Sequence, residues 1–278
     1  MDIKVVTVAT HNERFFDSFI YSCKKYNTKP VILGWGDKYT GHLMKDDLLL
    51  EYLDNNKENN IILFVDAFDC LLIRNINLLK NKFKKTGHRV IISMERNIKS
   101  ESNLGFIYSN FQNLFFGSID SNIINTGMII GYRDDLVRVL NEIKKYREID
   151  INSNQRIWTK AINSSIFLKD LIHIDIEQMF FKNFDMVSKQ NTITFKNNMV
   201  YIKETNTYPF VVQGNGYKNM NFICNKMRIK QSAIVLKNRV KYSGNFIYYY
   251  IYPYFKYCLL VFCLIIVLLK TKKDFRFN

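Results

Sequence analysis

The sequence predicts an α/β domain built on a mixed, mostly parallel sheet that is flanked by helices. Short, wholly apolar segments such as 3–9 and 60–65 alternate with segments in which apolar residues recur at helical spacing. This alternation favours parallel strands that are joined by crossover helices. The chain has 278 residues, of which 47% are hydrophobic, which is enough for one large domain and an appendage.

The elements of the first half follow one another closely. The helices show apolar residues three or four positions apart, as Phe15, Phe19 and Cys23 do. The segment 60–65 is apolar throughout, which is typical of a strand covered on both faces. The predicted strands are 3–9, 30–34, 60–65 and 89–93, and the predicted helices are 15–26, 43–53 and 78–85.

The second half is less regular. The segment NTGMIIGY at 125–132 predicts a strand whose glycines permit another segment to approach closely. Helices are expected over 134–145 and 155–162. Shorter pieces are expected at 175–184, 192–195, 199–203 and 210–212.

The net charge of +15 is concentrated near the C-terminus. Residues 226–278 contain eleven of the 40 Lys and Arg residues but only one of the 25 acidic residues. The same part of the chain holds the hydrophobic stretch 246–269. A segment that is both basic and apolar predicts attachment to membrane lipids, and it argues against nucleic acid as the partner.

These observations divide the chain into four parts. We expect a folded domain over 1–225, a basic juxtamembrane segment over 226–245, a hydrophobic membrane-anchor helix over 246–269 and a short basic tail over 270–278. A buried C-terminal helix of the domain is the alternative for 246–269. The larger basic group precedes the anchor, which favours a single-pass protein whose domain faces the cytosol.

The segment LFVDAFDCLL carries the sharpest chemical signal. Asp66 follows an apolar strand directly, and Asp69 lies three residues later. Ligands of open α/β sheets bind at the carboxyl ends of strands, and two carboxylates in a short turn suit a hard divalent cation. In the alternative reading, Asp66 only ends the strand and Asp69 caps a turn.

Other polar positions carry weaker signals. The run QGNG at 213–216 predicts a tight turn with Asn215 between two glycines, either an ordinary turn or a ligand-binding loop. Lys45 begins an amphipathic helix and can reach a phosphate or lie on a solvated face. Trp35 and Trp158 are expected in the core rather than as platforms for a sugar.

Seven segments, taken in order, resemble the glycosyltransferase domain of the procollagen lysyl hydroxylases, a Rossmann-like fold of GT-A type that uses UDP-sugars. The resemblance runs from about residue 4 to 220, and its order and spacing make it specific. The segments are VVTVAT at 5–10, GWGD at 34–37, LFVDAFD at 63–69, SME at 93–95, NTGMIIGY at 125–132, NQRIWTK at 154–160 and QGNG at 213–216.

The resemblance implies a role for each matching residue. Asp66 and Asp69 match a pair that binds Mn²⁺, and Gln213 stands where the family has a histidine as third ligand. Phe68 stands where the family has a tyrosine that contacts uracil. The other matching positions are Thr10 and Lys45, which contact the nucleotide, and Asn215 and Gly216, which lie on the diphosphate side.

Two departures from the family concern the chemistry. Gln213 is a neutral and weaker ligand than histidine. The family's run of acids toward the acceptor is replaced by DINSNQ at 150–155, so Asn154 and Gln155 occupy the expected catalytic positions and a general base or a charge stabiliser is missing there.

The resemblance therefore implies a metal-dependent hexosyltransferase that transfers a sugar from a UDP-sugar to a hydroxyl of a protein or glycan acceptor. The implied acceptor is hydroxylysine or galactosyl-hydroxylysine of a collagen-like chain. The other reading of the same residues is a catalytically degenerate, membrane-bound protein that binds a nucleotide or glycan.

Overall fold

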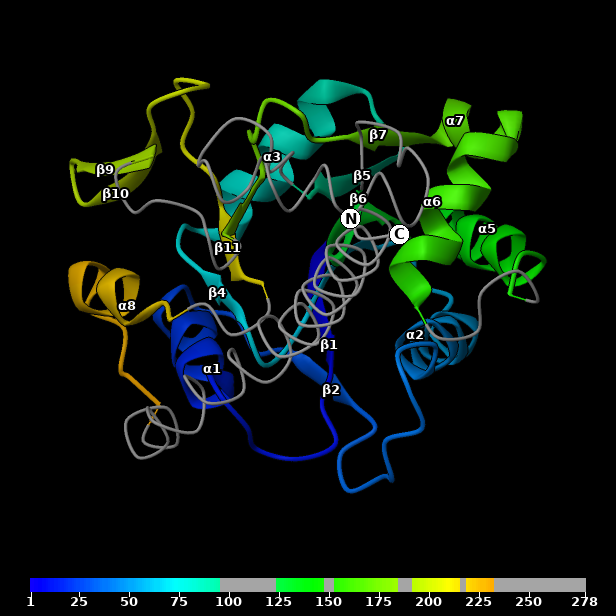
Figure 1. Ribbon diagram of the computed structural model, residues 1–278, viewed down its shortest axis with the longest axis horizontal. Coiled ribbons are helices and arrows are strands. Elements are labelled where there is room, and N and C mark those ends of the chain that lie inside the picture. Colours follow the sequence, from blue (N-terminus) through cyan, green and yellow to red (C-terminus); the bar gives the residue numbers. More distant parts are fainter. Residues whose placement is uncertain (96–123, 148–152, 185–191, 216–218, 233–278) are drawn as a thin grey trace, which may run out of the picture. The chain divides into compact units, whose positions relative to one another are not determined.

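The computed structural model describes residues 1–95, 124–147, 153–184, 192–215 and 219–232 (Figure 1). Its central sheet has six strands in the order β2-β1-β3-β6-β5-β7. Strand β6 is antiparallel to both of its neighbours, and the other pairs are parallel, so the predicted mixed, mostly parallel sheet is confirmed. The strands are β1 Ile3–Val8, β2 Val31–Leu33, β3 Ile61–Val65, β5 Val90–Met94, β6 Ile124–Tyr132 and β7 Ile172–Ile174.

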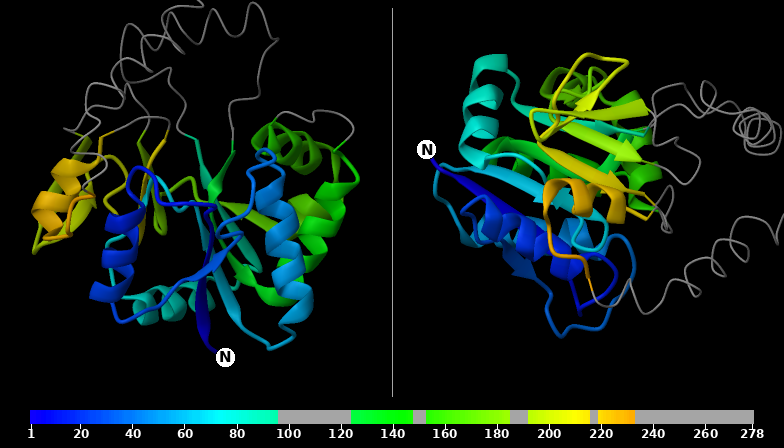
Figure 2. Two further views of the ribbon diagram at one scale, coloured as in Figure 1. Left: turned by 90° about the horizontal axis from the view of Figure 1, so that it is seen from below. Right: turned by 90° about the vertical axis from the view of Figure 1, so that its left-hand side faces the viewer.

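Helices cover both faces of this sheet, as Figure 2 shows. On one face lie α2 Met44–Asn55, α5 Arg133–Lys144, α6 Asn154–Ser164 and α7 Ile166–Leu171, and on the other lie α1 Phe16–Lys25 and α3 Ile76–Thr86. The alternating side chains of each strand supply both cores. In β3, for example, Ile62 and Phe64 pack under the first group, whereas Leu63 packs under the second.

A smaller sheet stands beside the large one and has the order β4-β11-β8. Its strands are β4 Cys70–Leu72, β8 Phe181–Phe184 and β11 Val211–Gly214. Strand β11 pairs antiparallel with β4, with Gln213 opposite Cys70. This register brings a side chain from late in the sequence next to Asp69. The hairpin of β9 Ile193–Lys196 and β10 Met199–Ile202, and the helix α8 Asn221–Met227, complete the described elements.

Every helix and strand predicted in the first half is present, with ends that differ by one or two residues. The predictions missed β4, β7, α7 and α8, which have three to seven residues each. Elements this short carry too few residues to display a periodic pattern. They form because tertiary neighbours supply their partners: β7, for instance, pairs with β5 at the sheet edge.

The predicted anchor over 246–269 lies outside the described residues, as do most of 226–245 and all of 270–278. Among the helices that the structure does describe, none is long and apolar enough to cross a membrane. The first compact unit of the chain comprises Met1–Ile234, so it continues past residue 225.

The two tryptophans have different environments. Trp158 is 1% exposed and lies in the core as expected, but the expectation for Trp35 is wrong, because its side chain is 55% exposed. Trp35 follows Gly34 beyond the end of the edge strand β2, and none of the described strands pairs with the outer edge of β2.

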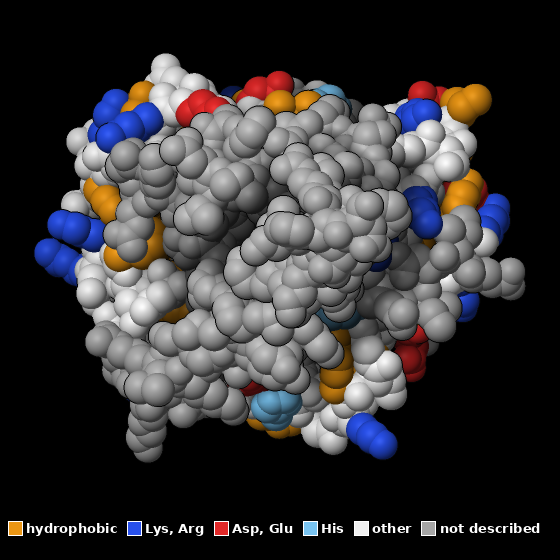
Figure 3. All heavy atoms as spheres, viewed as in Figure 1, with side chains coloured by type: hydrophobic (Ala, Val, Ile, Leu, Met, Phe, Trp, Pro, Cys, Tyr) orange, Lys and Arg blue, Asp and Glu red, His pale blue; other side chains and the backbone are white. Residues whose placement is uncertain are grey.

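In Figure 3, the described Lys and Arg side chains on the face shown are scattered around its rim and do not form one patch.

Candidate functional site

The two acidic residues of the LFVDAFDCLL segment lie between the large and small sheets. Asp66 directly follows β3, and its backbone N–H donates to the Gly127 carbonyl of β6 at 2.8 Å. Asp69 directly precedes β4 and is 8% exposed. The turn between β3 and β4 therefore holds both carboxylates at the carboxyl end of a buried strand, where α/β sheets bind their ligands.

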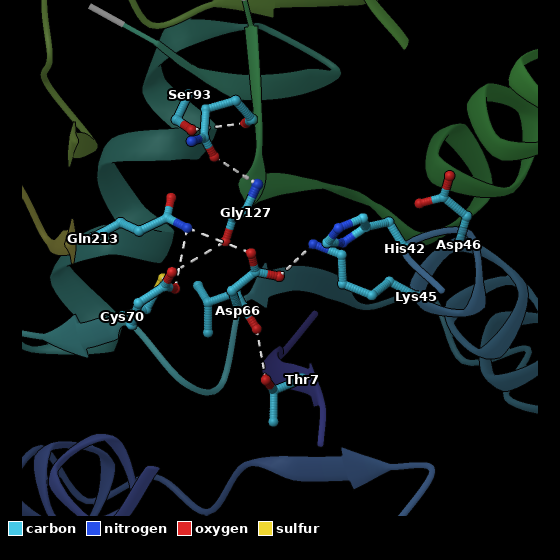
Figure 4. Close-up of polar contacts among 12 residues, drawn as sticks. Thr7, His42, Lys45, Asp46, Asp66, Cys70, Ser93, Gly127 and Gln213 are labelled. Atoms are coloured by element: carbon cyan, nitrogen blue, oxygen red, sulfur yellow. Dashed lines mark hydrogen bonds and ion pairs between the residues drawn. The ribbon is translucent and has the colours of Figure 1, made fainter. Parts of the chain in front are cut away.

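Gln213 joins these carboxylates from β11. Its Nε2 donates to Asp69 Oδ1 at 3.1 Å and approaches Asp66 Oδ2 at 3.4 Å. Figure 4 shows the Gln213 side chain pointing toward Asp66 from one side while Lys45 approaches from the other. The structure thus brings together the three residues that the resemblance assigned to the metal.

Two cations accompany the two carboxylates. Lys45, at the start of α2, donates to Asp66 Oδ1 at 2.8 Å. Arg14, which precedes α1, places its Nη1 3.5 Å from Asp69 Oδ2. Among the described residues, Lys45 pairs with Asp66 and Arg14 lies beside Asp69, and Gln213 contacts both acids. Arg14 was not predicted as a site residue, because no pattern in the HNER segment marks it.

The charges of these groups influence one another. Burial raises the pKa of Asp69 to about 6, and Asp66 adds to this, while Arg14, Gln213 and Lys45 oppose it. Burial alone would lower the pKa of the Lys45 ammonium, but the charge of Asp66 and its hydrogen bond outweigh this effect, so the pKa is raised. The site thus holds Lys45 in its charged form.

The local geometry fits a small cation bound between the acids and Gln213. A Cβ atom at Gly127 would lie 2.8 Å from Asp66 Oδ2 and 2.7 Å from Gln213 Oε1, so only glycine leaves this space open. Gln213 Oε1 is buried and accepts no hydrogen bond from the described residues. A rotation of the amide by half a turn would direct this oxygen at the acids and give three oxygen ligands of the kind that hard cations prefer.

The donor set is weaker than that of a typical transition-metal site. Among the described residues, no group of three His, Cys, Asp or Glu side chains is placed to hold a metal ion. Two carboxylates and one neutral amide remain, which suits Mn²⁺ or Mg²⁺ better than zinc.

A third carboxylate, Glu95, organises the side of the site next to β5 and β6. Its Oε2 accepts hydrogen bonds from Asn125 Nδ2 at 3.2 Å and from Gln155 Nε2 at 3.0 Å. Its Oε1 accepts a hydrogen bond from Asn215 Nδ2. In the sequence, Ser93–Glu95 is marked only as part of the resemblance. The signal that could have identified Glu95 is its place directly after the buried strand β5, like that of Asp66 after β3.

Asn154 and Gln155 point in different directions from the first turn of α6. Gln155 contacts Glu95, whereas Asn154 is buried beside Asp46 of α2. Asp46 also accepts a hydrogen bond from Trp158 Nε1 at 3.0 Å, which ties α6 to α2. The catalytic assignments of Asn154 and Gln155 stay predictions, and Gln155 is the one that reaches the site.

The residues expected to contact a nucleotide lie along the ends of the first strands. Thr10 follows β1, and its Oγ1 shares a hydrogen bond with His11 Nδ1 at 2.9 Å. The ring of Phe68 lies 5.5 Å from that of His11 and 6.3 Å from that of Phe16. The exposed Trp35 stacks on Phe16 at 5.2 Å. Asn215 follows β11, and Gly216 lies outside the described residues.

The family model described as "PLOD GT domain" matches residues 1–231. Among curated proteins, the procollagen-lysine,2-oxoglutarate 5-dioxygenase of Drosophila melanogaster is 25% identical over 235 residues, which cover 79% of this chain and 31% of the relative. The multifunctional procollagen lysine hydroxylase and glycosyltransferase LH3 of Homo sapiens is 24% identical over 228 residues, which cover 76% and 29%. The chain spans about a third of the length of these relatives.

Two solved structures show a more distant likeness. The galactosyltransferase LgtC, in complex with donor and acceptor sugar analogues, is 11% identical, covers 82% of this chain and 94% of that one, and has a TM-score of 0.45. A glycosyltransferase involved in glycosylation of the major capsid of PBCV-1 is 11% identical, covers 82% and 99%, and has a TM-score of 0.44. Scores this low do not by themselves establish a shared fold.

Proposed function

Since the chain belongs to the PLOD GT domain family, and is therefore a glycosyltransferase of the hexosyltransferase class, we propose that it transfers a hexose from a UDP-sugar to a hydroxyl group of a protein acceptor. The observation that carries this proposal is the convergence of Asp66, Asp69 and Gln213 from two sheets, with Lys45 beside them. Two acids and a cation at a strand end suit a diphosphate and its counter-ion.

The donor would lie across the strand ends that carry the predicted nucleotide residues. A divalent cation would be held by Asp66, Asp69 and the side-chain oxygen Oε1 of Gln213. This cation would stabilise the negative charge of the departing diphosphate. Lys45 is positioned to share that role once the acids have another partner. The rings of Phe68 and Trp35 flank Phe16 and offer apolar faces against which a uracil can stack.

Glu95 is the carboxylate best placed to act on the acceptor side. It contacts Gln155, which occupies an expected catalytic position, and Asn215, which follows β11 on the diphosphate side. A carboxylate between these two groups can accept the proton of an attacking hydroxyl or stabilise positive charge at the anomeric carbon. Glu95 would thereby supply the negative charge that 151–155 lacks.

The acceptor that we propose is hydroxylysine or galactosyl-hydroxylysine of a collagen-like chain, in line with the names of the relatives. The second candidate function is a degenerate protein that binds nucleotide or glycan without turnover, and the neutral Gln213 favours it. We further propose that the region 246–269 attaches the chain to membrane lipids, with the domain on the cytosolic side.

The decisive experiment measures UDP release by the full chain in detergent from a panel of UDP-sugars, with Mn²⁺ or with a chelator, and with or without an acceptor peptide. We expect Mn²⁺-dependent release that increases with acceptor. Asp66→Asn should abolish it without unfolding the domain, whereas Asp170→Asn, at an exposed position, should not. Tight UDP binding without release from any UDP-sugar would favour the second candidate function instead.

A further inference from the structure

Arg14 has an unusual backbone conformation at the edge of the site. Its φ angle is +50°, in the left-handed region that side chains other than Gly, Asn and Asp rarely adopt. The residues around it fix this conformation: Phe15 N–H donates to the Phe68 carbonyl at 3.1 Å, and Phe16 N–H donates to the Glu13 carbonyl at 3.0 Å. A conformation of this kind costs on the order of 1 kcal/mol or more and gathers at functional sites.

The guanidinium of Arg14 lies between the acids and the end of β11. It is 3.5 Å from Asp69 Oδ2, and it donates to the Gly214 carbonyl at 3.4 Å. Gly214 directly precedes Asn215, the residue expected on the diphosphate side. Both contacts are longer than the roughly 2.7–2.9 Å of a strong charge-assisted hydrogen bond. Phosphate oxygens at the distance of a strong hydrogen bond would therefore be better partners for the guanidinium than either of these two contacts.

The formal charges of the site point to such an exchange. Lys45 pairs with Asp66, and Arg14 lies beside Asp69. A divalent cation bound to the two acids would weaken both pairings. The diphosphate of a UDP-sugar carries negative charge that can take the place of the acids beside Lys45 and Arg14.

We propose that Arg14 is a diphosphate-binding residue of the donor site that exchanges Asp69 for the diphosphate when a divalent cation and the nucleotide bind together. The inference rests on the proposed function, because it assumes a UDP-sugar as the donor. It assigns the planar, bidentate guanidinium to the departing phosphate, a geometry that a lysine cannot supply. It also predicts that Arg14 competes with the cation for Asp69 when no nucleotide is present.

The test compares wild type, Arg14→Gln and Arg14→Lys by calorimetry, using Mn²⁺ alone, UDP with saturating Mn²⁺, and uridine. Arg14→Gln should weaken UDP binding about tenfold to a hundredfold and leave uridine binding unchanged. It should also tighten the binding of Mn²⁺ alone, because Asp69 loses its competing partner. The affinities of Arg14→Lys for UDP and for Mn²⁺ alone should lie between those of wild type and Arg14→Gln. Arg138→Gln, which removes an exposed arginine of α5 paired with Asp135, is the matched control and should change nothing.

These opposite shifts separate ligand binding from a structural role. If Arg14→Gln weakened UDP, Mn²⁺ and uridine alike, Arg14 would only support the fold, and the proposal would be overturned. Unchanged UDP affinity in Arg14→Gln would overturn it as well while leaving the donor site intact. A wild-type chain that bound no UDP would overturn the proposed function together with this role.

Discussion

Gly127 of β6 lies against the side chain of Gln213 so closely that no other residue fits. A Cβ atom at this position would be 2.4 Å from Gln213 Nε2 and 2.7 Å from Oε1. The Gly127 carbonyl also accepts a hydrogen bond from the backbone N–H of Asp66. Strand β6 therefore lines the site beside both Gln213 and Asp66. Gly127 of the NTGMIIGY segment thus permits the close approach of another segment that was predicted from the sequence.

Gly127→Ala should therefore impair the site more than the fold. The added methyl group has to displace Gln213 and Asp66, so we expect UDP affinity in the presence of Mn²⁺ to fall at least about tenfold. Gly131→Ala on the same strand is the matched control, since its Cβ would meet Leu136 and Val90 of the core at 3.0 Å. Gly131→Ala should lower the melting temperature without a selective loss of binding. Equal effects of the two variants on UDP affinity would contradict this role of Gly127.

Gln213→His should tighten Mn²⁺ binding on the order of tenfold, because imidazole is a better ligand for this metal than a neutral amide. Calorimetry with Mn²⁺ alone measures the effect. The same change in an Asp66→Asn background is the control and should produce no gain, since one carboxylate is then missing. If Gln213→His binds Mn²⁺ no better than wild type, the β11 loop does not contribute a ligand.

Asp175 should make the stability of the domain depend on pH. The residue is 1% exposed and accepts backbone hydrogen bonds from Met179, Phe180 and Phe181 at 2.8–2.9 Å. Burial raises the pKa of Asp175 to about 6, although these three N–H groups oppose the shift. In the unfolded chain the pKa of an Asp is about 3.9, so the folded pKa of Asp175 is the higher of the two. The stability that protonated Asp175 contributes is therefore fully present below pH ~4 and is lost as the pH rises through ~6.

The comparison with Asp175→Asn isolates this effect, because the variant cannot titrate there. The free energy of unfolding of wild type relative to the variant should fall by about 2–3 kcal/mol between pH ~4 and pH ~7. Urea unfolding followed by tryptophan fluorescence measures it, and Asp170→Asn at an exposed position is the control. A difference that stays constant with pH would show that Asp175 does not change its protonation in this range.

The C-terminal segment should hold the full chain on membranes by apolar burial rather than by charge. We expect the chain to sediment with membranes and to resist extraction by high salt, which screens surface charges beyond about 10 Å at moderate ionic strength. Val261→Lys together with Leu264→Lys keeps the length but adds on the order of 3 kcal/mol per lysine in the bilayer. That variant should move to the supernatant. Release of the wild type by salt alone would leave only peripheral attachment through the basic residues.

The sequence predicted the sheet, the family and the convergence of Asp66, Asp69 and Gln213, and these agree with the structure and the family match. Strand ends and ordered motifs carry such information, because parallel strands deliver their carboxyl ends to one edge. Arg14 could not be predicted in this way, because its partners lie 55 and 200 positions away in the sequence. The place of Glu95 directly after β5 is a strand-end signal of the same kind, but its partners come from β6, α6 and the end of β11, and their proximity depends on how these elements pack.

The last prediction concerns Glu95 and separates binding from transfer. Glu95→Gln keeps the length and one acceptor oxygen, which can still serve Asn125 and Gln155, but it replaces the oxygen that faces Asn215 with an NH₂ group and removes the negative charge. If this carboxylate acts on the acceptor or the anomeric carbon, transfer should fall by about a hundredfold to ten-thousandfold. UDP affinity should change by no more than about threefold, because Asp66, Asp69 and Lys45 are untouched.

Asn154→Asp provides a contrasting variant on α6. The resemblance to the family implies that this change restores an acid and raises the rate of transfer. The Asn154 side chain, however, lies buried beside Asp46, so a second carboxylate there meets a like charge. We therefore expect Asn154→Asp to lower stability and to leave the rate per folded molecule unchanged. Initial rates with a galactosyl-hydroxylysine peptide, normalised to UDP-binding sites, measure both variants. If Glu95→Gln retained the full rate while Asn154→Asp increased it, the base would lie on α6 and the role assigned to Glu95 would be wrong.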